Sequence, residues 1–267
     1  SFVLFVLFLL CPVCVTLGKT LPDQFNNKDV RGWIILSDDM NAAVRTIKAA
    51  KEYDINQLQL SHEIIHDLRE IKNEKVCAQV NELVNLAHSE GINEVLLWDH
   101  SLYNIDYYPE RFRTGPGGTI DLDNPEFWEW LKDDYRQMLD RVSEADGLVL
   151  TFIETGAYAE RQFSKKMKSS EEKLAAVVNA ISDVLIGERK KKLYIRTFAY
   201  SEEEYKGTTG CIEYLKYDEV ILMMKETPHD FFLTHPDNYY IQKMDRPVIV
   251  EFDLGNEYSG QGVVANT

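Results

Sequence analysis

The sequence predicts an α/β fold of the (β/α)8 TIM-type barrel class, and two observations lead to this prediction. Seven short apolar segments alternate with amphipathic segments from Arg31 onward, as expected of parallel strands separated by helices. Polar and acidic residues follow almost every apolar segment, which is typical of a barrel whose active site is surrounded by βα loops. A doubly wound open sheet fits the alternation too, but no glycine-rich phosphate loop follows the first strand.

The seven expected strands are short and apolar almost throughout, as in strands buried on both faces. They span residues 31–37, 55–61, 93–100, 147–156, 192–200, 218–226 and 246–254. An eighth strand is missing, and a seven-stranded barrel would expose a hydrophobic sheet edge, which natural folds avoid. We therefore expect this sequence to be a fragment, with a barrel domain over residues 29–267 that is cut at its C-terminal end.

Four amphipathic segments between these strands are expected to form helices, at residues 41–53, 75–91, 124–145 and 171–191. The first has three capping candidates, Asp38, Asp39 and Asn41. The third has Asn124 as its expected N-cap and Pro125 at the first helical position, where a missing backbone N–H costs nothing. These signals fix where two of the helices should begin.

The charge of the chain argues against one class of partner. Its 267 residues include 29 Lys and Arg and 44 Asp and Glu, for a formal net charge of −15. Nucleic acid requires a basic surface to neutralise its phosphates, so we expect no nucleic-acid partner. A few local basic residues could still bind a small anionic substrate.

The first 18 residues resemble the apolar core and cleavage region of a secretory signal peptide, recorded without its start. The segment is too short for a comfortable transmembrane span, so we expect a secreted or periplasmic protein with no other membrane attachment. Cys11 and Cys14 would leave with the signal. Cys77 and Cys211 would remain, and the sequence does not decide whether they form a disulfide.

Three carboxylates are expected at strand ends: Glu154 after the fourth strand, Asp230 after the sixth and Glu257 after the seventh. Hydrolysis of a glycosidic bond needs one protonated carboxyl group and a second carboxylate that activates water or attacks directly. A partly desolvated glutamate at a strand end suits the first role. Because 44 residues are acidic, chance placement is the alternative. No metal or cofactor is expected.

Five segments support the catalytic interpretation by their order and content: IDLDNPEFWEW (120–130), GLVLTFIETG (147–156), KLYIRTFAY (192–200), MMKETPHDFFLTHP (223–236) and VIVEFDLGNEYSGQG (248–262). Together they resemble segments of the α-glucuronidases of glycoside hydrolase family 67, over about residues 118–262. The resemblance implies a TIM-barrel glycosidase that acts on a carbohydrate, such as a polysaccharide fragment carrying uronic acid.

The resemblance also implies roles for individual residues. Glu154 falls on the family's general acid, and Asp230 and Glu257 fall on its candidates for activating water. Arg196 and Lys225 fall on site residues that could bind a substrate carboxylate. The reaction would proceed with inversion, with acid and base about 6.5–9.5 Å apart.

Further candidates and alternatives come from the residues themselves. Asp99 and His100, at the end of the third strand, are candidates for binding sugar hydroxyls, and a structural role is the alternative for both. For Arg196 and Lys225, the alternative is a structural pairing with the same three acids inside the barrel mouth. Thr234 departs from the family pattern, as does His235 beside it, so a related enzyme with another substrate stays open. A non-catalytic carbohydrate-binding barrel is a further alternative.

A rival motif lies after the second expected strand. His62, Glu63 and His66 match the H-E-x-x-H signature of zinc peptidases, in which two histidines on one helix face bind zinc and the glutamate is the general base. The motif directly follows a strand, so His62 is expected in a loop or at a helix start. The third ligand would have to be Glu70, Glu74 or Glu82.

Overall fold

A computed structural model describes residues 30–199, 201–226 and 237–252. The chain divides into two units between Val30 and Arg31, and every element below belongs to the second unit, Arg31–Thr267. Asp230, Glu257, Thr234 and His235 lie outside the described residues.

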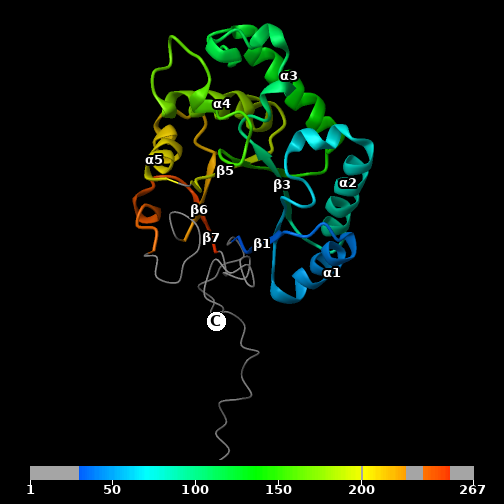
Figure 1. The fold of residues 1–267 in the computed structure, drawn as a ribbon. Helices are drawn as coiled ribbons and strands as arrows, with labels where there is room; N and C mark the ends of the chain where they lie inside the picture. Colours follow the sequence, from blue (N-terminus) through cyan, green and yellow to red (C-terminus); the bar gives the residue numbers. More distant parts are fainter. Residues whose placement is uncertain (1–29, 200, 227–236, 253–267) are drawn as a thin grey trace, which may run out of the picture. The chain divides into compact units, whose positions relative to one another are not determined.

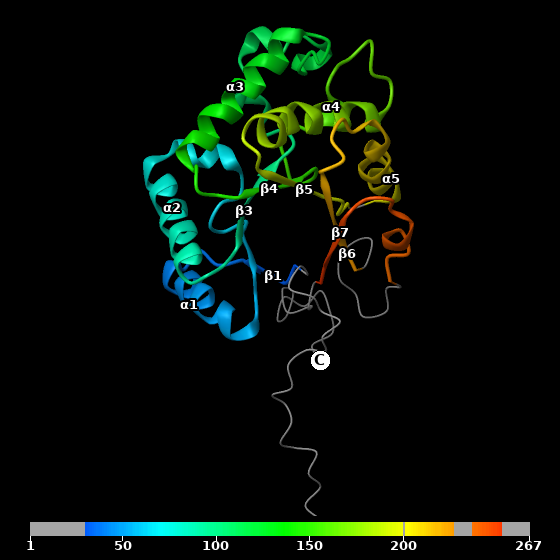
Figure 2. The ribbon, with the colours of Figure 1, turned by 180° about the vertical axis from the view of Figure 1, so that it is seen from behind.

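The described part of this unit contains seven strands, which pair in chain order and are all parallel. They are β1 (Gly32–Ile35), β2 (Gln57–Leu60), β3 (Glu94–His100), β4 (Gly147–Thr151), β5 (Lys192–Arg196), β6 (Ile221–Lys225) and β7 (Val248–Glu251). Each falls within its predicted segment, which confirms all seven. The sheet curls with helices on its outer side, as in a TIM-type α/β barrel (Figures 1 and 2).

Five α-helices lie among the described residues: α1 (Met40–Ala50), α2 (Glu74–Ser89), α3 (Pro125–Arg141), α4 (Ser170–Ser182) and α5 (Glu202–Gly210). The first four confirm the predicted helices. Asp39 caps α1 by accepting from the Asn41 backbone N–H, and Asn124 caps α3 in the same way through Glu126.

Helix α5 was not predicted, because its sequence EEEYKGTTG has no clear apolar stripe. It packs beside α4 in the tertiary structure. Shorter helical turns complete the unit: η2 (Lys51–Tyr53), η3 (Leu68–Lys72), η4 (Ile105–Tyr107), η5 (Glu110–Phe112), η6 (Pro116–Gly118), η7 (Ala159–Arg161), η8 (Asp183–Glu188), η9 (Cys211–Tyr214) and η10 (Ile241–Lys243). No helix in the described ranges has the length and apolar character to cross a membrane.

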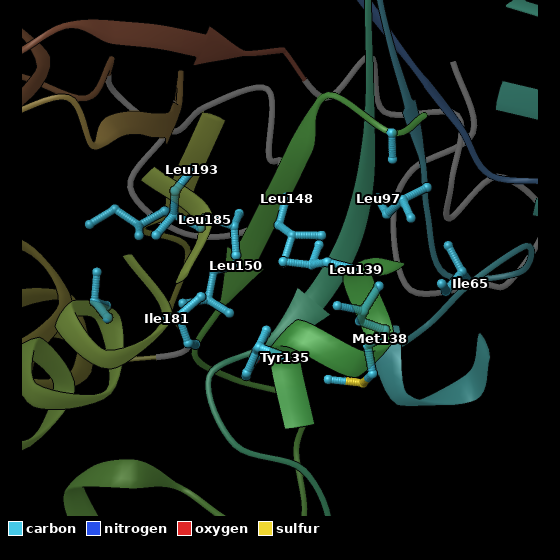
Figure 3. Close-up of a cluster of buried hydrophobic side chains, with 14 of the residues drawn as sticks. Ile65, Leu97, Tyr135, Met138, Leu139, Leu148, Leu150, Ile181, Leu185 and Leu193 are labelled. Atoms are coloured by element: carbon cyan, nitrogen blue, oxygen red, sulfur yellow. The ribbon is translucent and has the colours of Figure 1, made fainter. Parts of the chain in front are cut away.

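The main hydrophobic core lies between the outer face of the sheet and the helices. Leu97, Leu148 and Leu150 on the strands are fully buried in it. They share this layer with residues of the covering helices and of a neighbouring strand (Figure 3), namely Tyr135, Met138, Leu139, Ile181, Leu185 and Leu193. Each such leucine stabilises the fold by about 1.5–3 kcal/mol through burial. This layer fixes the strand directions and hence the side chains at the strand ends.

The inner face of the sheet carries a second, smaller cluster, formed by Leu96, Trp98, Val149, Tyr194 and Met223. Because side chains alternate along a strand, residues two positions further on share this face. The register therefore places a polar row at the carboxyl ends of the strands, made by His100, Thr151, Arg196, Lys225 and Glu251.

Cys77 and Cys211 are both buried and both free thiols. The question that the sequence left open is thus answered for the described fold: the two cysteines do not pair.

Candidate active site

Glu154 lies just beyond the carboxyl end of β4. The strand ends at Thr151, earlier than the predicted segment, and the chain bends before reaching Glu154. Glu154 has a φ of 60°, in the left-handed region that residues other than glycine seldom adopt. Such a conformation costs about 1–3 kcal/mol and is typical of functional sites. The bend leaves the carboxylate partly exposed, at 34%.

His62 follows the end of β2 and faces Glu154. Its Nε2 lies 3.4 Å from Glu154 Oε2. His62 also has a positive φ, of 31°. Two neighbouring residues fix the imidazole: Ser61 Oγ is 2.9 Å from Nδ1, and the Trp98 ring is 4.5 Å away between centroids. Trp98 is itself buried and donates from its indole N–H to Gln59 Oε1 at 3.1 Å. The His62 imidazole is therefore held by contacts with Ser61, Trp98 and Glu154.

Arg196, at the end of β5, forms a bidentate ion pair with Glu251, at the end of β7. Arg196 Nε and Nη2 each lie 2.7 Å from a carboxylate oxygen of Glu251. The two side chains are only 6% and 7% exposed. The guanidinium also stacks on Trp98 and Phe198, at 4.9 and 4.8 Å from the ring centroids. Two donors of Arg196 are thus engaged by Glu251, which is not one of the three acids named from the sequence.

Lys225 is the register partner of Glu251 and lies on the same inner face. Its side chain is mostly buried, and Nζ lies 4.3 Å from the centroid of the Phe198 ring. Phe198 thus touches both cations of this region, Arg196 and Lys225.

These contacts form one continuous row across the carboxyl ends of the strands. Glu154 contacts His62, His62 contacts Trp98, and Trp98 contacts Arg196. Arg196 then binds Glu251 and, through Phe198, reaches Lys225. The row brings together three residues expected from the sequence, Glu154, Arg196 and Lys225. We call this set of residues the mouth row.

Three members of the mouth row were not among the sequence-based candidates, namely Trp98, Phe198 and Glu251. The alternation of side chains in the VIVE segment could have indicated Glu251, since it lies two residues after the apolar Ile249 on the same face. From the sequence alone, Trp98 cannot be distinguished from an ordinary core residue. Only its contacts with His62 and Arg196 connect it with the site.

His100 lies deeper and contacts the mouth row through His66. The His66 ring centroid is 4.6 Å from that of His100 and 5.5 Å from that of His62. His100 is 1% exposed, and its Nδ1 lies 3.3 Å from Asp67 Oδ2. Burial lowers the pKa of His100, although Asp67 acts in the opposite direction. At this burial His100 is not itself open to a substrate.

Asp99 points to the outer face, away from the mouth row. Its carboxylate is fully buried and accepts from Arg69 Nη1 at 3.0 Å and from the Tyr135 hydroxyl at 2.6 Å. Burial raises the pKa of Asp99 to about 7. For Asp67, burial is outweighed by Arg69 and His100, which lower its pKa to about 2. Asp99 therefore has a structural role in this fold, and the expectation that it binds a sugar hydroxyl receives no support.

The H-E-x-x-H segment does not form the helix that a zinc peptidase requires. His62 lies in a turn with positive φ, and the next helical turn begins only at Leu68. Glu70 accepts a hydrogen bond from the His66 backbone N–H, and Glu74 pairs with Arg141. Within the described ranges no three His, Cys, Asp or Glu side chains are grouped so that they could hold a metal ion. The geometry thus argues against the rival interpretation.

Comparisons with known proteins support the fold. No protein-family model matches the sequence, and no curated protein matches it. A solved variant of NCR from Zymomonas mobilis is similar over 83% of this chain and 72% of its own, with 12% identity and a TM-score of 0.51. The solved structure of CpGH84B is similar over 74% of this chain and 33% of its own, with 14% identity and a TM-score of 0.46. This chain thus spans about a third of CpGH84B. At 12% identity the likeness to the NCR variant concerns the fold alone, which is an α/β barrel.

Proposed function

We propose that this chain hydrolyses a glycosidic bond in a uronic-acid-containing carbohydrate, with Glu154 as the general acid. The mouth row is the observation that carries the proposal. Glu154, Arg196 and Lys225 come from three separate segments that resemble α-glucuronidases, and side-chain contacts join them at the carboxyl ends of the strands. In TIM-type barrels this end of the sheet holds the active site.

Glu154 is partly exposed beyond the end of β4, where a substrate could reach it. In the proposed reaction, the carboxyl proton of Glu154 passes to the glycosidic oxygen as the bond from that oxygen to the anomeric carbon breaks. A water molecule attacks the anomeric carbon from the opposite face and gives its proton to a second carboxylate. The resemblance assigns that base role to Asp230 or Glu257, and the product would have inverted configuration.

Recognition of the uronic acid group is proposed for Lys225. Arg196 directs Nε and Nη2 to Glu251, which supports a role in organising the mouth row. Lys225 is the second cation at this end of the inner face among the described residues, and an ammonium group binds a carboxylate as a point charge. The signal-like N-terminal residues support a substrate located outside the cytoplasm.

A direct test compares wild type with two glutamate variants on glucuronic-acid-substituted xylo-oligosaccharides. Glu154→Gln keeps the shape of the side chain and removes the proton donor, so we expect hydrolysis to fall by about 10²–10⁴-fold. Glu63→Gln is the matched control, because Glu63 lies one residue from His62 and is the general base of the rival mechanism. It should hydrolyse the oligosaccharide at the wild-type rate.

Three outcomes would contradict the proposal. A wild-type chain that binds the oligosaccharide without releasing product would indicate a non-catalytic carbohydrate-binding barrel. Full hydrolysis by Glu154→Gln would remove Glu154 from the acid role. Peptidase activity that is lost in Glu63→Gln and kept in Glu154→Gln would favour the rival motif.

A further inference from the structure

The turn after β2 holds a histidine whose two ring nitrogens both face defined partners. Ser61 Oγ lies 2.9 Å from Nδ1 of His62, and Glu154 Oε2 lies 3.4 Å from Nε2. Ser61 is fully buried, whereas the His62 and Glu154 side chains are 27% and 34% exposed. The arrangement therefore runs from a buried hydroxyl through the imidazole to a carboxyl group that is open to a substrate.

We infer that His62 is a positioning residue, which orients the Glu154 carboxyl group for protonation of the glycosidic oxygen. This inference rests on the function proposed above. It uses the H-E-x-x-H segment in a way that requires no metal, and it assigns a role to a histidine that the resemblance leaves without one.

The hydrogen bond at one imidazole nitrogen decides which nitrogen carries the proton. When the Ser61 hydroxyl donates to Nδ1, the hydrogen of the neutral ring is on Nε2, which then donates to Glu154 Oε2. A protonated carboxyl group has one oxygen that accepts and one that carries the proton. With Oε2 accepting from His62, the transferable proton of Glu154 is on Oε1, and its direction is fixed.

Two features of the backbone and packing keep this geometry in place. His62 and Glu154 both have positive φ, so the turns after β2 and β4 are specialised to point these side chains toward each other. The Trp98 ring supports the imidazole at 4.5 Å and also stacks on Arg196. A rigid support matters because misplacement of a catalytic group by about 1 Å can cost about 10²-fold in rate.

The test uses two substitutions of His62 that differ in reach. His62→Gln places an amide N–H near the position of Nε2, so it can still donate to Glu154. The side chain in His62→Asn is shorter, so its amide lies only near the position of Nδ1, beside Ser61, and cannot reach Glu154. His88→Gln is the matched control, because His88 Nε2 lies 3.3 Å from Asp146 Oδ2 with side-chain exposures of 31% and 35%, close to those of the His62–Glu154 pair.

Each variant is assayed as the full chain on phenyl α-D-glucuronide and on 2,4-dinitrophenyl α-D-glucuronide. Phenolate is a poor leaving group and departs only with help from a general acid, whereas 2,4-dinitrophenolate leaves without it. We expect His62→Asn to lower kcat on phenyl α-D-glucuronide by about 10–100-fold, which is less than the loss expected when the general acid itself is removed. On the dinitrophenyl substrate, kcat should change by less than about threefold. His62→Gln should recover most of the loss, and His88→Gln should match wild type on both substrates.

The outcomes separate this inference from the proposed function. If Glu154→Gln loses rate selectively on the phenyl substrate and His62→Asn does not, the role of His62 is wrong while the function stands. Equal losses of His62→Asn on both substrates would indicate a merely structural effect and also overturn the inference. A wild-type chain that cleaves neither the glucuronides nor the substituted xylo-oligosaccharides, or a Glu154→Gln variant with equal losses on both glucuronides, would overturn the function and the inference with it. If His62→Asn does not fold, Ser61→Ala replaces it, with the same selective loss expected.

Discussion

Arg196 and Glu251 are 55 residues apart in sequence and form a bidentate, almost fully buried ion pair at the carboxyl ends of β5 and β7. The two residues are not on neighbouring strands, because β6 lies between β5 and β7. The contact therefore joins the end of the described sheet to the row of residues that contains Glu154.

Breaking this pair from one side should strongly destabilise the protein. Arg196→Met leaves a buried carboxylate, and Glu251→Leu leaves a buried guanidinium. We expect each to lower the free energy of unfolding by about 3–5 kcal/mol. The double variant should lose less than the sum of the two, because no unpaired charge is left inside. Urea unfolding of all four proteins measures the coupling, and additive losses would show that the pair contributes no interaction energy.

Because Glu154 has a left-handed backbone conformation, the stability of its variants should depend on whether the new side chain is β-branched. Asparagine tolerates the left-handed region, whereas a β-branched residue does not. We expect Glu154→Asn to keep the wild-type free energy of unfolding within about 0.5 kcal/mol, and Glu154→Val to lower it by about 1–3 kcal/mol. Both variants should lack hydrolytic activity. Equal stability of the two in thermal unfolding would show that the left-handed conformation is not required at this position.

Asp99 should make stability depend on pH. Its pKa is raised to about 7 in the folded protein, from 3.8, so the folded state retains a proton that the unfolded chain loses. This contribution to stability is complete below about pH 4 and is lost as the pH rises through 7. Between pH 5 and pH 8, the wild-type protein should therefore lose about 2 kcal/mol more than Asp99→Asn, which cannot titrate.

Urea unfolding of both proteins at the two pH values gives this difference directly. Asp67 does not contribute in this window, because its pKa falls to about 2 and its titration lies below pH 4. His100, whose pKa is lowered, acts in both proteins and cancels in the comparison. Identical pH dependence of wild type and Asp99→Asn would show that Asp99 is ionised throughout.

The thiol of Cys211 should be chemically inert in the folded protein. Burial raises its pKa to about 12, and the thiolate is the reactive form. We expect iodoacetamide at pH 8 to leave Cys211 unmodified in the native protein and to modify it fully in guanidinium chloride, as measured by peptide mass. Modification of the native protein at a rate close to the unfolded one would mean that this part of the core opens readily.

Local pattern determined most of the fold. Short apolar runs predicted segments that contain all seven strands, and Asn124 with Pro125 marked the start of α3. These signals work because strand burial and helix capping depend on residues close together in the chain. The end of β4 differs from prediction, since the left-handed turn at Glu154 interrupts an otherwise apolar run.

The orientation of side chains at the strand ends was decided by the tertiary structure. Asp99 and His100 are adjacent in sequence, yet one faces Arg69 on the outer side and the other faces the interior of the curled sheet. Both faces of a barrel strand are buried, so hydrophobic alternation carries no mark of which side is inner. The sequence could place Glu154 and Arg196 at strand ends. Their connection through His62 and Trp98 could not be predicted, because it depends on the register and curl of the sheet.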